Sequence, residues 1–143
     1  TTNWVRGVYP TRETAKKGVD AGTLYVLEEN GKICAHMILN DDRPPHYDAV
    51  AWEYPAKPNE IRVIHTLCVL PSMKGHGYAT QMVNFAIDRA RSEGCKALQI
   101  DTEIGNIPAQ TLYKKAGFHL AGQKKVLHEG VLERTLVFLE YKL

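Results

Sequence analysis

The stretch Val69–Ala79 constrains the fold of this chain more than any other part of the sequence. The apolar, β-branched run Ile61–Val69 leads into it and is typical of a buried strand. The residues that follow, Tyr78–Ala90, carry apolar side chains at helical spacing. The first backbone N–H groups of a helix have no partner within it, and the helix dipole places positive charge behind them. A strand, a glycine turn and a helix in this order predict a socket for a phosphate or pyrophosphate.

The residues of the turn narrow the kind of ligand. Gly75 and Gly77 let the backbone approach an anion closely, and Lys74 adds a positive charge beside it. No Gly-Lys-Ser/Thr follows, as a nucleoside-triphosphate loop requires, and the dinucleotide pattern G-x-G-x-x-G is incomplete. A nucleotide-binding switch would also need a set of Mg²⁺ ligands, which is missing, so this class is not favoured.

Two motifs together resemble a known family. Lys74-x-x-Gly77-x-Ala79 resembles the acyl-CoA loop of the GCN5-related N-acetyltransferases, Gln/Arg-x-x-Gly-x-Gly/Ala, with Lys at the first position. Asn106–Phe118 resembles the second signature of the same family, Asn-x-x-Ala-x-x-Leu-Tyr-x-x-x-Gly-Phe. The chain is identified as a member of this GNAT family over roughly Thr23 to the C-terminus.

The resemblance implies a fold, a cofactor and a reaction. The fold is mixed α/β, with a mostly antiparallel, twisted sheet that is splayed at its centre to admit the cofactor and is flanked by helices. The cofactor is acetyl-CoA, and the reaction is direct attack by a primary amine in a ternary complex, without a covalent enzyme intermediate. The alternative is a non-catalytic acyl-CoA-binding regulatory module, because Lys74 departs from the family pattern.

The resemblance also implies where the cofactor binds. Main-chain amides of the glycine turn would hold the pyrophosphate, and the backbone around Leu67–Val69 would pair with the pantetheine arm, which Asn106 would also contact. The full set of expected cofactor-binding residues is Leu67, Cys68, Val69, Lys74, Gly75, His76, Gly77, Tyr78, Ala79, Thr80, Asn106, Ala109 and Tyr113.

Two residues are expected to be catalytic. In the family, a tyrosine at the position of Tyr113 protonates the departing thiolate, and a phenol suits this step because it stays protonated at neutral pH. Alternatively, Tyr113 only packs in the core. His65 resembles the histidine with which arylalkylamine acetyltransferases help to deprotonate the amine, although a buried histidine bonded to a backbone carbonyl fits as well. Glu53 and Glu60 are rival bases, and a backbone donor near Leu67–Val69 would stabilise the oxyanion.

The acceptor is expected to lie among the loops between Asn40 and Asn59. Trp52 and Tyr54 either line an amine pocket or cover the sheet, and Glu53 either attracts a cationic amine or is simply solvated. The acceptor itself, a small molecule or a peptide amine, stays open. Cys68 is predicted to face away from His65 and to belong to the core rather than to act as a nucleophile.

Length and composition favour one ordinary domain spanning residues 1–143. Its 44% apolar and 24% charged residues are those of a globular protein, and a net charge of +2 does not favour nucleic acid or a membrane surface as the main partner. No long apolar run is present. Three cysteines, odd in number and without a Cys-x-x-Cys pair, indicate reduced thiols in a cytoplasmic protein and no metal site.

The remaining elements follow from turn and capping signals. A short helix to about Ala21, a hairpin around Asn30-Gly31, a strand over Lys96–Thr102 and a helix after Asn106 are predicted. A terminal hairpin, Phe118–Leu127 and Leu132–Tyr141 around a turn at residues 128–130, would complete the sheet and could support a homodimer. Family members begin with a further strand and helix, so we expect that the chain as given lacks them.

Overall fold

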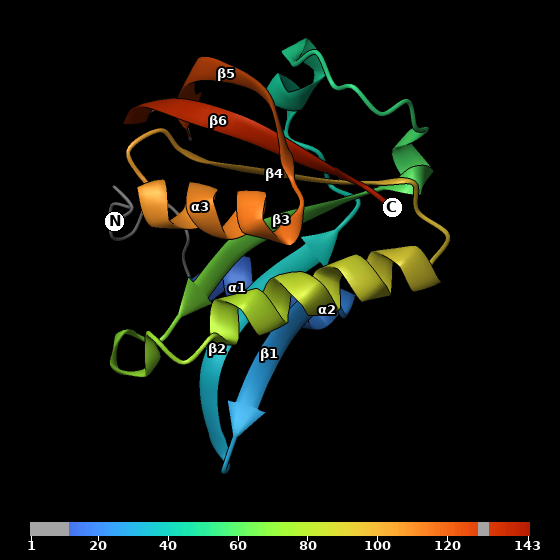
Figure 1. Cartoon of the computed structure of the whole chain (residues 1–143). Helices are drawn as coiled ribbons and strands as arrows, with labels where there is room; N and C mark the ends of the chain where they lie inside the picture. The colour runs from blue at the N-terminus through green and yellow to red at the C-terminus, as the bar shows by residue number, and fades with distance from the viewer. Residues whose placement is uncertain (1–11, 129–131) are drawn as a thin grey trace.

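A single six-stranded sheet runs through the computed structural model, which describes residues 12–128 and 132–143 (Figure 1). The strand order is β1-β2-β3-β4-β6-β5, and every neighbouring pair is antiparallel except β3 and β4. The mixed, mostly antiparallel sheet that the motifs implied is therefore confirmed. The strands are β1 (Leu24–Glu29), β2 (Lys32–Asn40), β3 (Ile61–Val69), β4 (Ala97–Glu103), β5 (His119–His128) and β6 (Leu132–Lys142).

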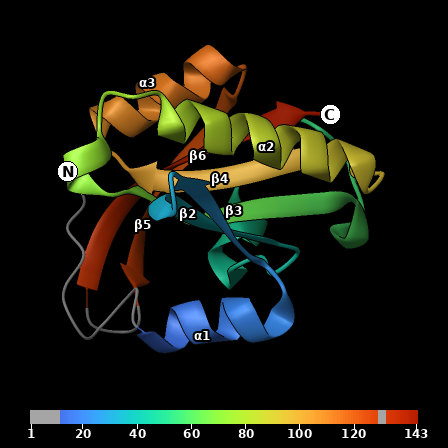
Figure 2. The ribbon, with the colours of Figure 1, turned by 90° about the horizontal axis from the view of Figure 1, so that it is seen from below.

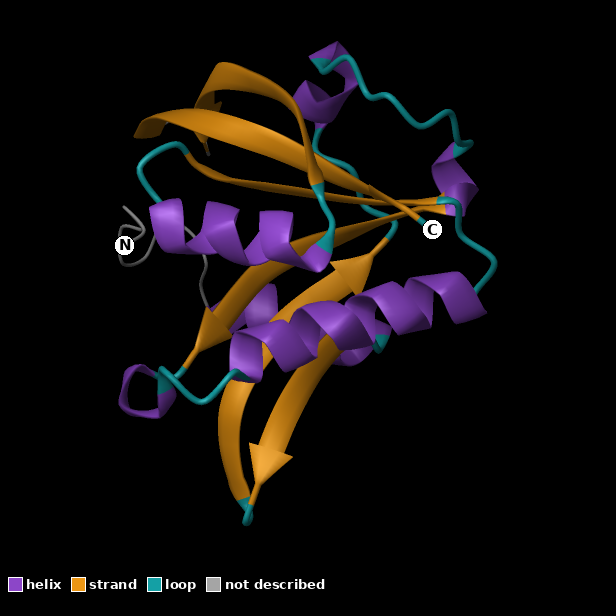
Figure 3. Ribbon diagram, viewed as in Figure 1, coloured by secondary structure: helices purple, strands orange, loops and turns teal. Residues whose placement is uncertain are grey.

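Helices cover both faces of this sheet. The helices α2 (Tyr78–Ser92) and α3 (Ile107–Ala116) lie on one face, and α1 (Arg12–Ala21) lies on the other, as the view in Figure 2 shows. Gly18 brings α1 close to Leu24 and Ile38 of the first hairpin. Within the described residues, three short 3-10 helices interrupt the loops (Figure 3): η1 (Pro45–Ala49), η2 (Pro58–Glu60) and η3 (Pro71–Met73).

The sheet parts between its two central strands. β3 and β4 pair only from Ile61 with Ala97 to Val63 with Gln99, although both strands continue beyond these residues. The halves β1-β2-β3 and β4-β6-β5 therefore diverge toward the carboxyl ends of the central strands (Figure 1). This is the splay that the family resemblance implied, and it opens the sheet at the level of the glycine turn.

A β-bulge in β3 changes the direction of the side chains at the splay. His65 lies opposite Ile38 and Cys68 lies opposite His36. An advance of three residues along β3 therefore corresponds to only two residues along β2. Thr66, with φ 51°, takes up the extra residue. Since partners two residues apart on a strand share a face, His65 and Cys68 also share one. The prediction that Cys68 faces away from His65 was wrong, because strict alternation fails across a bulge.

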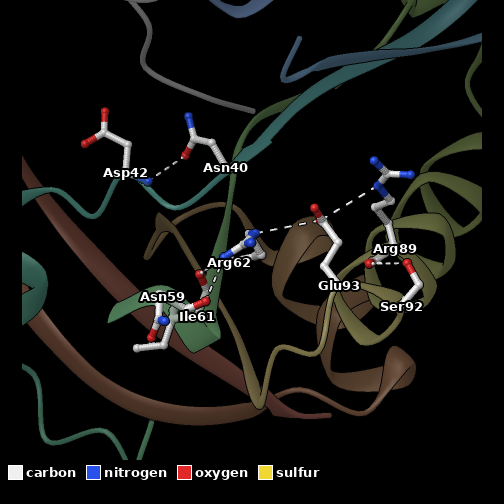
Figure 4. Close-up of polar contacts among 8 residues, drawn as sticks. All are labelled: Asn40, Asp42, Asn59, Ile61, Arg62, Arg89, Ser92 and Glu93. Carbon is white, nitrogen blue, oxygen red and sulfur yellow. Dashed lines mark hydrogen bonds and ion pairs between the residues drawn. The ribbon is translucent and has the colours of Figure 1, made fainter. Parts of the chain in front are cut away.

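An arginine joins the two ends of the β3–turn–α2 unit. Arg62, at the start of β3, donates from Nη1 to the carbonyls of Asn59 and Ile61 at 3.3 and 3.0 Å. Its Nε lies 3.7 Å from Oε1 of Glu93, just beyond the last turn of α2, and Arg89 approaches the same oxygen (Figure 4). The contacts link the start of β3 to the far end of α2.

Two apolar clusters hold the layers together. The cluster between the sheet and α2–α3 includes Met37, Val83 and Leu98, all fully buried. The cluster on the opposite face includes Tyr47 and Phe138, also fully buried. β4 and β6 contribute to both clusters because both of their faces are covered. None of the helices among the described residues is long and apolar enough to cross a membrane.

The remaining sequence predictions divide into tested and untested ones. The first helix, the hairpin around Asn30-Gly31 and the helix capped by Asn106 are confirmed, the last with the side chain of Asn106 accepting from the N–H of Ala109 at 3.3 Å. The two terminal strands are confirmed as β5 and β6, but residues 129–131 of their turn lie outside the described residues. The expectation that the chain lacks an initial strand and helix stays untested, because residues 1–11 lie outside that part, and the single domain and the homodimer also stay predictions.

Candidate active site

The glycine turn places unpaired backbone donors at the mouth of the splay. Gly75 (φ 85°) and Gly77 (φ 75°) both adopt the left-handed conformation, and Gly77 is the N-cap residue of α2. No side chain of the described residues caps this helix, and Gln81 N–H is the first to donate back, to Gly77 O at 3.0 Å. The N–H groups of Tyr78–Thr80 precede that bond, so the first turn offers its donors and its dipole to a ligand.

Neighbouring side chains shape the turn. The ring of His76 stacks on Tyr78 with a centroid distance of 5.6 Å, and its Nδ1 lies 3.0 Å from the carbonyl of Met73. The hydroxyl of Tyr78 donates to Glu29 on β1. These contacts tie the turn to η3 and to the first hairpin, so its backbone groups are oriented before any ligand arrives.

The first of two adjoining cavities runs from this turn to α3. Its volume is about 400 Å³, and Leu67 and Val69 of the splayed strand form its floor between the turn and Tyr113. Of the predicted cofactor-binding residues, all but Cys68, His76 and Asn106 line this cavity. We call it the cofactor cavity. Its lining is Leu67, Val69, Met73, Lys74, Gly75, Gly77, Tyr78, Ala79, Thr80, Pro108, Ala109, Leu112 and Tyr113.

The second cavity lies where β3 and β4 part, and we call it the acceptor cavity. Its volume is about 440 Å³, and it shares Leu67, Ala109 and Tyr113 with the cofactor cavity. His65 and Asn106 line it as well. The shared residues bring the two cavities together at the side chain of Tyr113. The full lining is Asp42, Pro44, Pro45, His46, Ile64, His65, Thr66, Leu67, Ile100, Asp101, Thr102, Glu103, Asn106, Ala109, Tyr113, Val126, Leu127 and Arg134.

Tyr113 is a buried phenol at the junction. Only 5% of the residue is exposed, and its ring packs against Phe118 at a centroid distance of 5.7 Å. Burial raises the pKa of Tyr113 well above its usual value, and the negative charge of Asp101 raises it further. Since both effects disfavour the phenolate, the hydroxyl carries its proton throughout the neutral range and can donate it.

His65 is a neutral imidazole with a defined tautomer. Its Nε2 lies 2.8 Å from Oδ1 of Asn40, which also accepts the backbone N–H of Asp42 at 3.0 Å (Figure 4 shows this second contact). Because Oδ1 is an acceptor, Nε2 donates to it and Nδ1 keeps the lone pair. Burial lowers the pKa of His65, and the charges of Asp101 and Asp42 and a hydrogen bond to the backbone of Asp42 oppose this shift. The ring is therefore suited to accept a proton.

The rival bases lie elsewhere. Glu60 pairs with Lys96 at 3.0 Å and accepts the N–H of Lys57, and these contacts hold the pKa of its carboxyl below the usual value. Glu60 stands just before β3, at the opposite end of that strand from the glycine turn, and lines neither cavity. Glu53 is exposed and also lines neither cavity. Of the three candidates, only His65 reaches the acceptor cavity.

Trp52 covers the sheet. Its Nε1 donates to the carbonyl of Tyr47 at 2.8 Å, and its ring packs against Tyr47 and Phe138. The backbone N–H of Glu53 donates to Glu140 at 2.6 Å. Trp52 and Glu53 line neither cavity, and the contacts of Trp52 fit the alternative in which it covers the sheet. Their role at the acceptor stays a prediction.

The structure adds polar residues that the sequence did not single out for the site. Tyr47 is fully buried and donates its hydroxyl to Oδ2 of Asp101 at 2.6 Å. Nε of Arg134 lies 2.6 Å from Oε1 of Glu103, an ion pair rather than a well-directed hydrogen bond, with both side chains less than 10% exposed. The signal in the sequence was the pair of acidic residues Asp101 and Glu103 at the end of the predicted strand, but the sequence did not decide whether they face the cleft or solvent.

The cysteines are free thiols, and the possible metal ligands do not cluster in the described part of the chain. Cys34, Cys68 and Cys95 are free thiols, the first and last of them buried. Burial raises the pKa of the Cys95 thiol. No three His, Cys, Asp or Glu side chains in the described part of the chain gather closely enough to hold a metal ion.

Comparison with known proteins agrees with the two motifs. Residues 3–118 match the model of the acetyltransferase (GNAT) family. N-alpha-acetyltransferase 30 of Saccharomyces cerevisiae is 38% identical over 55 residues, which are 38% of this chain and only 31% of that protein. The chain thus matches less than a third of the length of this relative.

Solved structures share the fold over most of the chain. A structure described as a putative acetyltransferase from Staphylococcus aureus superimposes with a TM-score of 0.69 at 29% identity, over 91% of this chain and 78% of that one. A Bacillus subtilis acetyltransferase, solved in complex with CoA, has a TM-score of 0.70 at 20% identity, over 94% of this chain and 86% of that one.

Proposed function

We propose that this chain, which belongs to the acetyltransferase (GNAT) family, transfers the acetyl group of acetyl-CoA to a primary amine by direct attack. The observation that carries the proposal is that one buried phenol, Tyr113, lines both the cavity at the glycine turn and the cavity that holds His65. A cofactor thioester and an amine that approached from these two sides would meet beside it.

In the proposal, acetyl-CoA occupies the cofactor cavity. The N–H groups of Tyr78–Thr80 and the left-handed turn at Gly77 bind the pyrophosphate, with Lys74 nearby. The pantetheine arm follows Leu67 and Val69, whose strand has no partner on the β4 side at this level. The CoA complex of the Bacillus subtilis neighbour supports this choice of cofactor.

The chemistry then needs three proton transfers: two from the nitrogen and one to the sulfur. The amine reaches His65 as an ammonium, gives one proton to Nδ1, and attacks the thioester carbonyl with the freed lone pair. A carbon–nitrogen bond forms, and the negative charge on the oxygen of the tetrahedral intermediate is stabilised by a backbone N–H at the bulge near Leu67. The carbon–sulfur bond breaks as Tyr113 protonates the sulfur, and the extra proton on the nitrogen passes to the tyrosinate, which restores the phenol. The products are the N-acetylated amine and CoA.

The experiment that tests this proposal is an assay of thiol release from acetyl-CoA with a panel of primary amines. We expect turnover that requires the amine, with intersecting initial-velocity lines, and no acetyl group retained on the protein after incubation with labelled acetyl-CoA. A labelled protein, or parallel lines, would contradict direct attack. CoA binding without turnover on any amine would favour the alternative, a regulatory module that binds acyl-CoA without catalysis.

A further inference from the structure

Asp101 is held in the acceptor cavity by a part-buried hydrogen bond. It lies on β4 beyond Gln99, the last residue that pairs with β3, so the strand there faces the opened cavity. Oδ2 accepts the hydroxyl of Tyr47 at 2.6 Å, and Tyr47 is fixed by its packing against Trp52 and Phe138. A carboxylate accepts several hydrogen bonds, so Oδ1 keeps its capacity for a ligand.

The ionised groups that line the acceptor cavity do not balance. Arg134 is engaged by Glu103 at 2.6 Å, so this buried pair contributes no net charge. Asp42 and Asp101 have no cationic partner among the described lining residues. The nearby Arg43 is directed to Asp48 and Gln99, each at 3.0 Å. The described lining thus holds three carboxylates, those of Asp42, Asp101 and Glu103, against the single guanidinium of Arg134.

The negative charge of the acceptor cavity favours acceptors that carry more than one positive charge. An acceptor with a single amine brings one positive charge, which passes to His65 within the same cavity, so one of the two carboxylates stays uncompensated. An α-amino acid brings a further carboxylate, and the one arginine of the cavity is already paired. A diamine keeps one ammonium while the other amine reacts. The cavity, of about 440 Å³, has the size of a small-molecule site.

We propose that Asp101, oriented by Tyr47, binds a second ammonium group of the acceptor, which makes the preferred substrate an aliphatic diamine or polyamine. This inference rests on the proposed function. Asp101 acts here as a binding residue that selects the acceptor, and Tyr47 acts as a positioning residue for it. The acetyl group goes to the free amine, and the ammonium at Asp101 remains unchanged through the reaction.

The test compares kcat/KM for 1,4-diaminobutane, butylamine and 2,4-diaminobutanoate in the wild type and in Asp101→Asn. Asparagine keeps the shape and still accepts the Tyr47 hydroxyl, but it loses the charge. We expect the wild type to prefer the diamine, and the variant to lose on the order of tenfold to a hundredfold of that preference. Because the ratio is taken within one protein, changes at His65 or Tyr113 that affect both amines cancel.

A matched control and a second variant complete the test. Asp88→Asn removes the same charge from α2, where the side chain is 79% exposed and lines neither cavity, and should leave the preference intact. Asp42→Asn, on the exposed loop, should reduce the preference less. Equal rates with butylamine, or a preference unaltered in Asp101→Asn, would overturn the diamine inference alone. Acetylation of no amine at all would overturn the proposed function with it.

Discussion

Replacing Tyr113 by phenylalanine isolates the proposed proton donor. The substitution removes one buried hydroxyl and keeps the ring that packs against Phe118 and lines both cavities. A positioned general acid contributes about 10² to 10⁴ in rate. A thiol has a pKa of about 8.5, so its thiolate leaves fairly well without help. We therefore expect an effect at the lower end of this range, a fall in kcat of about 10²-fold, which corresponds to an increase of about 3 kcal/mol in the activation barrier.

The assay is thiol release at saturating acetyl-CoA and amine, together with calorimetric titration of CoA. Binding of CoA should change little, because the ring remains and the turn is untouched. Tyr25→Phe is the matched control, since it also removes a phenol but lies on β1, packs against Phe85 and lines neither cavity. If Tyr113→Phe turns over like the wild type, the role of proton donor is refuted. Weaker CoA binding with normal kcat would make Tyr113 a packing residue of the cofactor cavity.

Three further predictions concern the base, the proton donor and the helix ends. In the wild type, kcat/KM should rise with pH through the pKa of His65, which burial sets below its usual value. His65→Gln should remove this low-pH limb of the profile, and an unchanged limb would exclude His65 as the base. In the wild type, loss of rate through ionisation of Tyr113 should begin only above the usual tyrosine range, since its pKa is raised; a decline near pH 8 that Tyr113→Phe abolishes would contradict this. Gly117→Ala should lower the free energy of unfolding, measured by urea denaturation, by about 2 kcal/mol. The new Cβ would lie 2.9 Å from the ring of Tyr141, and the backbone of residue 117 has a φ of 109° that alanine disfavours. An unchanged denaturation midpoint would refute the clash.

Local signals in the sequence predicted the part of the site that is made of backbone. The β3–turn–α2 unit follows from one apolar run, two glycines and a helical repeat, all contiguous in the chain. α3 follows in the same way from Asn106 and Gly117, because capping depends on residues within one helical turn. Tyr113 could be placed on this helix because the motif around it is continuous.

The acceptor side could not be predicted, because its contacts are long-range. Tyr47 and Asp101 are 54 residues apart in sequence, and Glu103 meets Arg134 from another strand. The bulge at Thr66 leaves no mark in the pattern of apolar residues, yet it decides which face His65 and Cys68 share. The sequence left open whether Trp52 lines a pocket or covers the sheet, and its packing against Phe138, which is distant in sequence, favours the second alternative.

The central claim, that the glycine turn binds the pyrophosphate of CoA, is tested most directly by calorimetric titration of CoA into the wild type and Gly77→Val. An added Cβ at Gly77 meets no protein atom within 4 Å. The substitution therefore acts by disfavouring the left-handed backbone (φ 75°) and by filling the space beside the turn that the pyrophosphate would occupy. We expect binding at one site in the wild type and a loss of at least about tenfold in the variant, with the fold retained by circular dichroism. Equal affinity in both proteins, or no binding to the wild type, would contradict the assignment of the turn.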